Sequence, residues 1–290
     1  MNFLEFNDLT FSYPPVENDK DENGNQIVPP VIFEHFSAGF PGGCFLSLVG
    51  QNGCGKSTFL LLASGRLAPS AGSVTLLGKN PFFLNQEDKN LLASVIYQNV
   101  EFEDDEKTGV LLEHVFNNGA LKGSASGILE ESKKTGKSLL QETIQVFELE
   151  KFLDRSILHL SKGELQRTIL AFSLLYGSPV VFMDEPMFAM EESQKEKSLS
   201  YLKEFVKKTG TTIYCAMHEL DLTKKYADLV LLFYPDRDMS LGTPEEVLTP
   251  KDLERAYNIP AAMLKEKESL NREQLRQIAV QYGNHPLESE

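Results

Sequence analysis

The sequence contains no long hydrophobic run. Of its 290 residues, 41% are hydrophobic, which suffices for one large domain or two small ones. No stretch approaches the roughly 18 to 20 consecutive apolar residues that span a bilayer. The first nine residues, MNFLEFNDL, lack a basic segment and a long apolar stretch, so we expect no signal peptide. These absences favour a cytoplasmic location.

Cysteine is scarce, and basic residues are scattered. The three cysteines, Cys44, Cys54 and Cys215, lack the spacing of metal ligands, so we expect them to be reduced and structural. The formal net charge is −14, and no cluster of lysine or arginine is present. A protein that binds nucleic acid usually has a basic face. The charge pattern therefore argues against a nucleic-acid partner.

The chain does contain a glycine-rich phosphate-binding pattern. Residues 50–58 read GQNGCGKST and match G-x-x-x-x-G-K-[ST]. The preceding residues 44–49 favour a strand, and residues 59–63 favour a helix. A turn between them directs several backbone N–H groups, together with the positive end of a helix dipole, at one point. The expected phosphate-binding residues are Gly50, Gln51, Asn52, Gly53, Cys54, Gly55, Lys56, Ser57 and Thr58.

Two side chains in this turn have specific expected roles. Lys56 would bring a positive charge to the β- and γ-phosphates, and the Ser57 hydroxyl would bind Mg²⁺. A second element follows at residues 180–183, an apolar strand that ends in Asp184 and Glu185. Asp184 would hold Mg²⁺ through water, and Glu185 would act as the general base for an attacking water. Any strand can end in an acid, so the position after a phosphate-binding loop gives this pattern its weight.

Two further elements complete the candidate site. Residues 211–217 favour a strand that ends at His218, which could donate a hydrogen bond to a γ-phosphate. Residues 160–167, LSKGELQR, favour a helix start in which Ser161 and Glu164 form a capping box. This helix start is either only structural or a second anion-binding site. In the second case one chain offers it no phosphate of its own, which points to a partner subunit.

Five ordered motifs resemble those of the ATP-binding-cassette ATPase domain over roughly residues 1–250. They are GQNGCGKST, Gln98, LSKGELQR, VVFMDEP and His218. The resemblance implies the α/β fold of P-loop nucleoside triphosphatases, with a β-rich edge, a central mostly parallel sheet with flanking helices, and a helical subdomain at about 100–176. It implies a nucleotide-binding domain at 1–263, followed by a helical tail at 264–290.

The resemblance also implies roles and partners. Tyr13 would stack on adenine, and Gln98 would sense Mg²⁺ and the attacking water. His218 would contact the γ-phosphate. Two cassettes, expected to be two copies of this chain, would pair head to tail with ATP between them. Ser161, Gly163 and Glu164 would then face the nucleotide of the partner.

Three segments depart from the family pattern. The signature usually reads LSGGQ, and here Lys162 and Glu164 replace its third and fifth residues. The loop after the second acidic strand usually reads SALD, and here residues 188–191 read FAME. Residues 16–30 form an acidic insertion in which Asp19, Asp21, Asn23 and Gly24 match half of a calcium-binding loop. Its twelfth position is Pro30, which has no carboxylate, so we expect a solvated hairpin tip.

The C-terminal part suggests what the ATPase powers. Thr243 and Thr249 each precede a proline at an expected helix start. Residues 241–250 together with 256–260 resemble the tails of ATPases from importers of the iron–siderophore, haem and cobalamin type. In the last residues, Leu275, Ile278, Ala279 and Tyr282 share one helix face, which predicts a terminal helix packed on its own domain rather than a regulatory segment.

These features lead to three hypotheses. The first is the ATPase subunit of a membrane transporter, most simply an importer of a metal chelate or similar small solute. It would lie on the inner face of the cell membrane through separate permease subunits, with a solute-binding protein as a further partner. The second is a soluble cassette ATPase that acts on a macromolecular assembly in translation, repair or iron–sulfur assembly. The third is a regulatory ATP-binding module with little turnover.

Overall fold

The computed structural model of the chain describes residues 3–15, 26–98, 100, 102–103, 105–121 and 138–259. Most of the acidic insertion, part of the glycine-rich segment 119–127 and the whole tail from residue 260 lie outside these ranges. The predictions for a hairpin tip and for a terminal helix therefore stay predictions. No helix among the described residues combines the length and the apolar content needed to cross a membrane.

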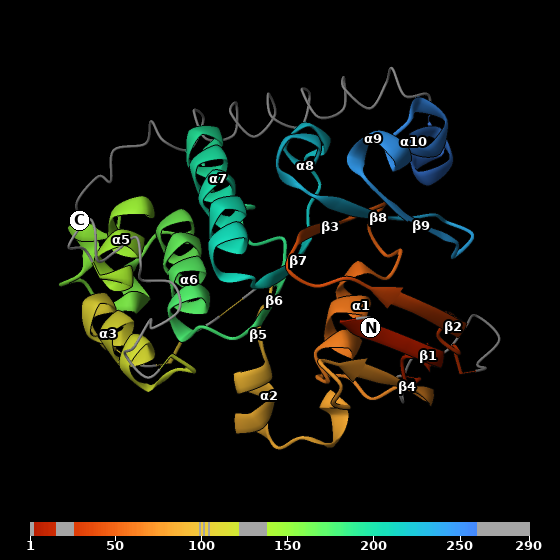
Figure 1. The fold of residues 1–290 in the computed structure, drawn as a ribbon, viewed down its shortest axis with the longest axis horizontal. Helices are drawn as coiled ribbons and strands as arrows, with labels where there is room; N and C mark the ends of the chain where they lie inside the picture. Colours follow the sequence, from red (N-terminus) through yellow and green to blue (C-terminus); the bar gives the residue numbers. More distant parts are fainter. Residues whose placement is uncertain are drawn as a thin grey trace, which may run out of the picture.

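A large mixed sheet forms the centre of the molecule (Figure 1). Its strand order is β5-β6-β7-β3-β8-β9. All pairs are parallel except the last, where β9 runs antiparallel to β8. The strands are β5 (Ala93–Ile96), β6 (Val180–Asp184), β7 (Thr212–Ala216), β3 (Phe45–Val49), β8 (Leu229–Phe233) and β9 (Met239–Gly242).

A second, antiparallel sheet has the order β2-β1-β4. It consists of β1 (Leu4–Ser12), β2 (Val31–Phe40) and β4 (Ala71–Leu76). The helix α1 (Lys56–Ala63) lies between the two sheets, and its Phe59 ring packs against Phe6, Phe40 and Phe233. This sheet is the β-rich edge expected from the sequence.

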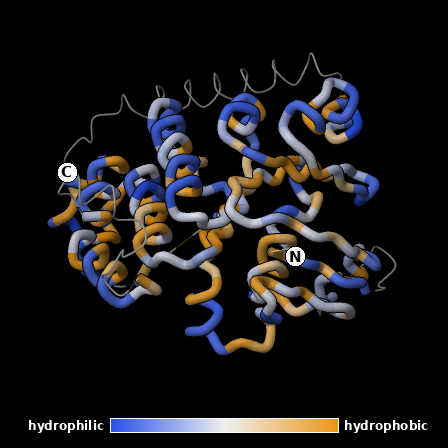
Figure 2. The backbone as a smooth tube through the Cα atoms, viewed as in Figure 1, coloured by the Kyte–Doolittle hydropathy of each residue, from blue (hydrophilic) through white to orange (hydrophobic). Residues whose placement is uncertain are grey.

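The two faces of the large sheet pack into two different cores. Because successive strand residues point to opposite faces, Leu46 and Leu48 join the core under the antiparallel sheet, while Phe45 and Val49 join the core under the helices. Strands buried on both faces are nearly continuous runs of apolar residues. Figure 2 shows this concentration of hydrophobic residues along the middle of the molecule.

The helices gather in two groups (Figure 1). The group next to β5 contains α3 (Thr108–Asn118), α5 (Leu139–Val146) and α6 (Lys162–Tyr176), within the range expected for a helical subdomain. The other group contains α8 (Leu220–Tyr226), α9 (Pro244–Val247) and α10 (Pro250–Tyr257). Helix α7 (Glu192–Thr209) lies between the two groups and contacts α5 and α8. Shorter elements are α2 (Gln86–Leu92) and the 3-10 turns Pro81–Phe83, Glu150–Phe152 and Ile157–His159.

Both helix starts predicted from threonine before proline are confirmed. Thr243 precedes α9 and forms a capping box with Glu246. Thr249 precedes α10, and its side chain accepts a hydrogen bond from the backbone of Asp252. Proline suits the first helical position because its fixed φ is helical and its missing N–H has no partner there.

Candidate functional site

The glycine-rich turn follows a fully buried strand of the large sheet. All five residues of β3 are buried, and α1 begins at Lys56 directly after the turn. Gly50 has a φ of 154°, and a Cβ at this position would lie 2.9 Å from the Cys54 Sγ and 3.0 Å from the carbonyl oxygen of Phe233. Only glycine therefore allows the chain to leave β3 in this direction.

Lys56 occupies the middle of the turn. Its Nζ donates hydrogen bonds to the carbonyl oxygens of Gly50, at 2.8 Å, and Gln51, at 3.0 Å. The side chain is only 6% exposed. Burial raises the pKa of the nearby Cys54 thiol, although the positive charge of Lys56 opposes this. The turn thus places one cation beside a neutral thiol, which suits an anionic ligand.

Ser57 and Asp184 meet at the start of α1. Burial raises the pKa of Asp184, whereas a hydrogen bond from the Ser57 hydroxyl lowers it, and the charge of Glu185 raises it further. A cation bound at these oxygens would offset the cost of burying the carboxylate. Hydroxyl and carboxylate oxygens are ligands that Mg²⁺ accepts, so this pair fits the metal expected from the sequence.

Glu185 is held by two other candidate residues. Its Oε1 lies 2.6 Å from Nε2 of His218, and its Oε2 accepts a hydrogen bond of 3.0 Å from Nε2 of Gln98. The backbone of Glu185 has a φ of 49°, and its N–H donates to the carbonyl of Ala216 at 3.2 Å. This left-handed conformation is uncommon for a residue with a Cβ, and it fixes the direction of the carboxylate.

Sheet topology explains why these side chains meet. Gln98 follows β5, Glu185 follows β6 and His218 follows β7, and the three strands are parallel neighbours. Their carboxyl ends therefore lie at one edge of the sheet, where parallel α/β folds place their ligands. The structure brings Gln98 into hydrogen-bond contact with Glu185, and its expected place near Mg²⁺ stays a prediction.

Tyr13 lies beside the glycine-rich turn. Its hydroxyl is 3.0 Å from the Thr58 Oγ1, and its ring packs edge-on against Phe11 with centroids 5.0 Å apart. The residue remains 40% exposed. The exposed part of the Tyr13 side chain can therefore contact a ligand next to the phosphate site.

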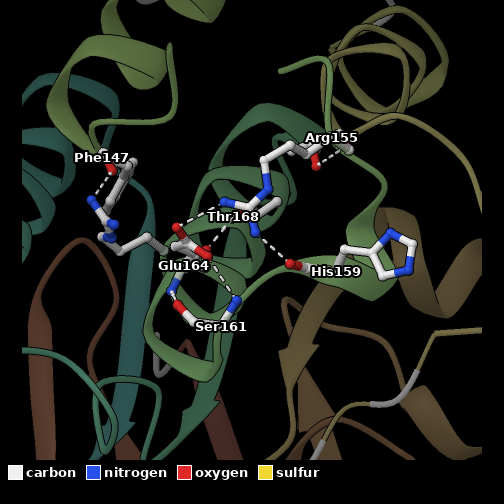
Figure 3. Close-up of polar contacts among 8 residues, drawn as sticks. Phe147, Arg155, His159, Ser161, Glu164 and Thr168 are labelled. Carbon is white, nitrogen blue, oxygen red and sulfur yellow. Dashed lines mark hydrogen bonds and ion pairs between the residues drawn. The ribbon is translucent and has the colours of Figure 1, made fainter. Parts of the chain in front are cut away.

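Ser161, Gly163 and Glu164 form the first turn of α6, apart from the glycine-rich turn. The capping box is present: the backbone N–H of Ser161 donates to Glu164 Oε2 at 2.7 Å, and the Ser161 Oγ accepts from the N–H of Glu164 at 3.4 Å (Figure 3). Helix α6 packs on α3, α5 and β5, whereas α1 packs on β4, β6 and β7. Among the described residues, no hydrogen bond joins this first turn to residues 50–58.

Glu164 is ionised more readily than an ordinary glutamate. Burial alone would raise the pKa of its carboxyl group. The hydrogen bonds from the Ser161 backbone and side chain, together with the charge of Arg155, outweigh burial and lower the pKa. A negative charge is therefore fixed in the first turn of α6.

A contact between α6 and the loop before α7 was not predicted from the sequence. The backbone N–H of Ala189 donates to the Gln166 Oε1 at 2.7 Å, and a Cβ on Gly163 would lie 2.8 Å from the carbonyl oxygen of Ala189. Met187 and Met190 are buried, while Phe188 is 67% exposed. The loop at residues 188–191, which departs from the family pattern, therefore packs against the first turns of α6 and exposes the Phe188 ring.

The chain matches a known protein family over the segment that contains most of these residues. A family model described as ABC transporter matches residues 33–188, which is more than half of the chain. The matched range contains the glycine-rich turn, Gln98, the start of α6 and the acidic end of β6.

The sequences of individual relatives have diverged widely from this chain. The Energy-coupling factor transporter ATP-binding protein EcfA2 of Methanospirillum hungatei JF-1 is 29% identical over 264 residues, covering 91% of this chain and 61% of that protein. The Cobalamin import ATP-binding protein BtuD of Halobacterium salinarum is 25% identical over 232 residues, covering 80% of this chain and 56% of that protein. This chain therefore spans about three fifths of the length of these relatives.

Solved structures share the fold. A structure of the ATP binding subunit of an ABC transporter superposes with a TM-score of 0.68 at 20% identity, covering 91% of this chain and 98% of that chain. This likeness confirms the predicted fold class, a central mostly parallel sheet with flanking helices and a β-rich edge.

Proposed function

Because this chain belongs to the ABC transporter family, we propose that it is the ATP-binding and ATP-hydrolysing subunit of a multi-subunit membrane transporter. The main observation in support of this proposal is that Gln98 and His218 both contact the Glu185 carboxylate. These residues lie at the same edge of the sheet as the glycine-rich turn. A carboxylate oriented in this way is suited to take a proton from an attacking water.

Each side chain has a defined task in this proposal. Residues 50–58 bind the phosphates of ATP, and Lys56 exchanges its bonds to the Gly50 and Gln51 carbonyls for bonds to phosphate oxygens. Glu185 accepts the proton of the water, and Gln98 and His218 orient its carboxylate. Ser57 and Asp184 would hold Mg²⁺, which neutralises charge on the phosphates when it is bound.

We further propose that the chain works as a pair of identical subunits arranged head to tail. The helix start at Ser161 belongs to α6, which packs on α3, α5 and β5, whereas the glycine-rich turn leads into α1, which packs on β4, β6 and β7. A helix start of this kind binds anions well. In a head-to-tail pair it would face the phosphates that the other copy holds.

Import of a metal chelate or a similar small solute is the transport reaction that we propose. The names of two relatives refer to energy-coupling factor transport and to cobalamin import. The segment 241–250, which resembles the tails of importer ATPases, forms the end of β9, all of α9 and the start of α10. Permease subunits, with or without a solute-binding protein, would provide the path and the choice of solute.

The transporter proposal can be tested by recovering the tagged chain from detergent-solubilised membranes of its source cells. We expect a polytopic membrane protein to co-purify in a fixed ratio and to be identified by mass spectrometry. A Glu185→Gln variant, which should stay assembled, serves as a second bait. Recovery only from the soluble fraction, with ribosomal, nucleic-acid or cluster-assembly partners, would contradict the transporter and favour the macromolecular alternative.

Tyr13 provides a test of nucleotide binding at this site. Replacing Tyr13 with alanine should weaken ATP binding roughly tenfold, because a base stacked on an aromatic ring contributes about 1–3 kcal/mol. Tyr13→Phe, which keeps the ring and loses the contact with Thr58, should change the affinity less than about threefold on the same basis. Titration calorimetry with ATP and with tripolyphosphate checks this.

Only ATP binding should respond to Tyr13→Ala, because tripolyphosphate has no base to stack. An equal loss for both ligands would show that Tyr13 supports the turn through Thr58 and does not contact adenine.

A further inference from the structure

An arginine outside the predicted motifs lies against the first turn of α6. Arg155 belongs to the irregular segment that precedes α6. Its NH1 donates to Glu164 Oε1 at 3.1 Å, and its NH2 donates to the carbonyl oxygen of His159 (Figure 3). The guanidinium thus joins the residues on either side of Ser161.

This contact completes the bonding of the Glu164 carboxylate. Its Oε2 already accepts the N–H of Ser161, and Arg155 occupies its Oε1. The planar guanidinium presents donors in a fixed fork, so it can serve a carboxylate and a carbonyl at once, whereas a lysine ammonium lacks that fixed geometry. Arg155 therefore fixes the first turn of α6 relative to the segment before it.

The backbone of Arg155 is fixed as well. Its carbonyl oxygen accepts hydrogen bonds from the N–H of Thr108, at 2.9 Å, and from the Thr108 Oγ1, at 3.0 Å. Thr108 is the first residue of α3, and it follows Gln98 by a short segment of the chain. Arg155 thus links the start of α3 to the start of α6.

Charge gives Arg155 a second task. The start of α6 would have to bind phosphate, and a carboxylate in that first turn repels an anion. Glu164 stands where the family signature usually has glutamine, so this repulsion is specific to a chain with an acid here. The guanidinium of Arg155 forms an ion pair with that carboxylate and offsets its negative charge.

We propose that Arg155 is a positioning residue that makes the start of α6 able to bind the nucleotide phosphates held by a second copy of this chain. It does so by fixing the turn around Ser161 and by neutralising Glu164. The inference rests on the proposed function, because it takes the second copy and its ATP as the partner.

The test measures dimer formation with ATP in a Glu185→Gln background, where slow hydrolysis should let the dimer accumulate. Analytical ultracentrifugation across protein concentrations gives the dimer dissociation constant. Arg155→Ala should raise this constant at least about tenfold, which corresponds to a loss of about 1.4 kcal/mol in dimer stability. This loss is shared by the two equivalent nucleotide sites of the dimer. Binding of ATP to the monomer should not change, because no hydrogen bond in the described part of the chain joins the first turn of α6 to residues 50–58.

Three further variants separate geometry from charge and from folding. The double variant Arg155→Ala with Glu164→Gln should have a dimer dissociation constant at least about threefold lower than that of Arg155→Ala alone. Glutamine can still accept a hydrogen bond from the Ser161 N–H but carries no charge. The dimer dissociation constant of Arg155→Lys should lie between those of the parent and of Arg155→Ala. Arg255→Ala removes an arginine of α10 with the same side-chain exposure, 44%, that pairs with Asp236 and Asp238 in the segment between β8 and β9. This variant should have the dimer dissociation constant of the parent.

Each outcome bears on one of the two proposals. A dimer that forms equally well with Arg155→Ala would overturn the inference and leave the proposed function standing. A double variant no better than Arg155→Ala would overturn the neutralisation of Glu164. If the Glu185→Gln parent forms no dimer with ATP, the proposed pairing is wrong, and the inference is overturned with it.

Discussion

Replacing Glu185 with glutamine should leave ATP binding nearly unchanged and should reduce ATP hydrolysis by at least about 100-fold, the lower end of what a general base contributes. The glutamine side chain has the same shape and still accepts the hydrogen bond from Gln98, but it cannot take a proton from water. In the structure both oxygens of Glu185 are held, one by Gln98 and one by His218. These two contacts therefore hold the Glu185 carboxylate in one orientation.

The measurement is phosphate release under saturating ATP, with ATP affinity measured separately by calorimetry. Glu196→Gln is a matched control, because Glu196 is an exposed glutamate on α7 that pairs with Lys225 and lies outside the site. Hydrolysis at the parental rate in Glu185→Gln would show that another group activates the water. A loss of ATP affinity would show that the substitution disturbs the site as a whole.

Replacing Lys56 with alanine should weaken ATP binding about 100-fold, which corresponds to about 2.7 kcal/mol. Lys56 brings a buried ammonium group to the middle of the glycine-rich turn. Removing it deletes the charge that faces the phosphates and leaves the carbonyl oxygens of Gly50 and Gln51 without this donor. Carbonyl dipoles directed at phosphate oxygens oppose binding, so the effect should exceed that of one neutral hydrogen bond.

Calorimetric titration with ATP measures this loss directly. Lys224→Ala, at the end of α8, removes an exposed lysine and should bind ATP like the parent. Thermal unfolding without nucleotide distinguishes a damaged turn from a damaged fold. Tight ATP binding by Lys56→Ala would mean that the backbone N–H groups of the turn suffice for the phosphates.

The parts of the site that the sequence predicted are those fixed by local chain geometry. The turn at residues 50–55 needs only a strand before it and a helix after it, and both can be recognised from composition. Glu185 and His218 could be placed at one edge because each follows an apolar strand, and parallel strands end on the same side. The capping box of Ser161 and Glu164 is likewise a local pattern.

What the sequence did not predict depends on contacts between distant segments. The hydrogen bond of Gln98 to Glu185 requires β5 beside β6, and the strand order cannot be read from either strand alone. Arg155 lies in an irregular segment with no motif, and its role depends on the packing of α3 near α6. Gln166 contacts Ala189 because α6 and the loop before α7 are adjacent in space, and spacing along the chain gives no sign of it.

The left-handed backbone at Glu185 places stability and activity in opposition. A non-glycine residue in this region of φ costs of order 1 kcal/mol, and glycine would adopt the same turn without that cost. Selection for a stable fold alone would therefore favour a glycine after β6, while selection for turnover retains a carboxylate there. Laboratory evolution for heat resistance, without a requirement for activity, would be expected to replace Glu185 early.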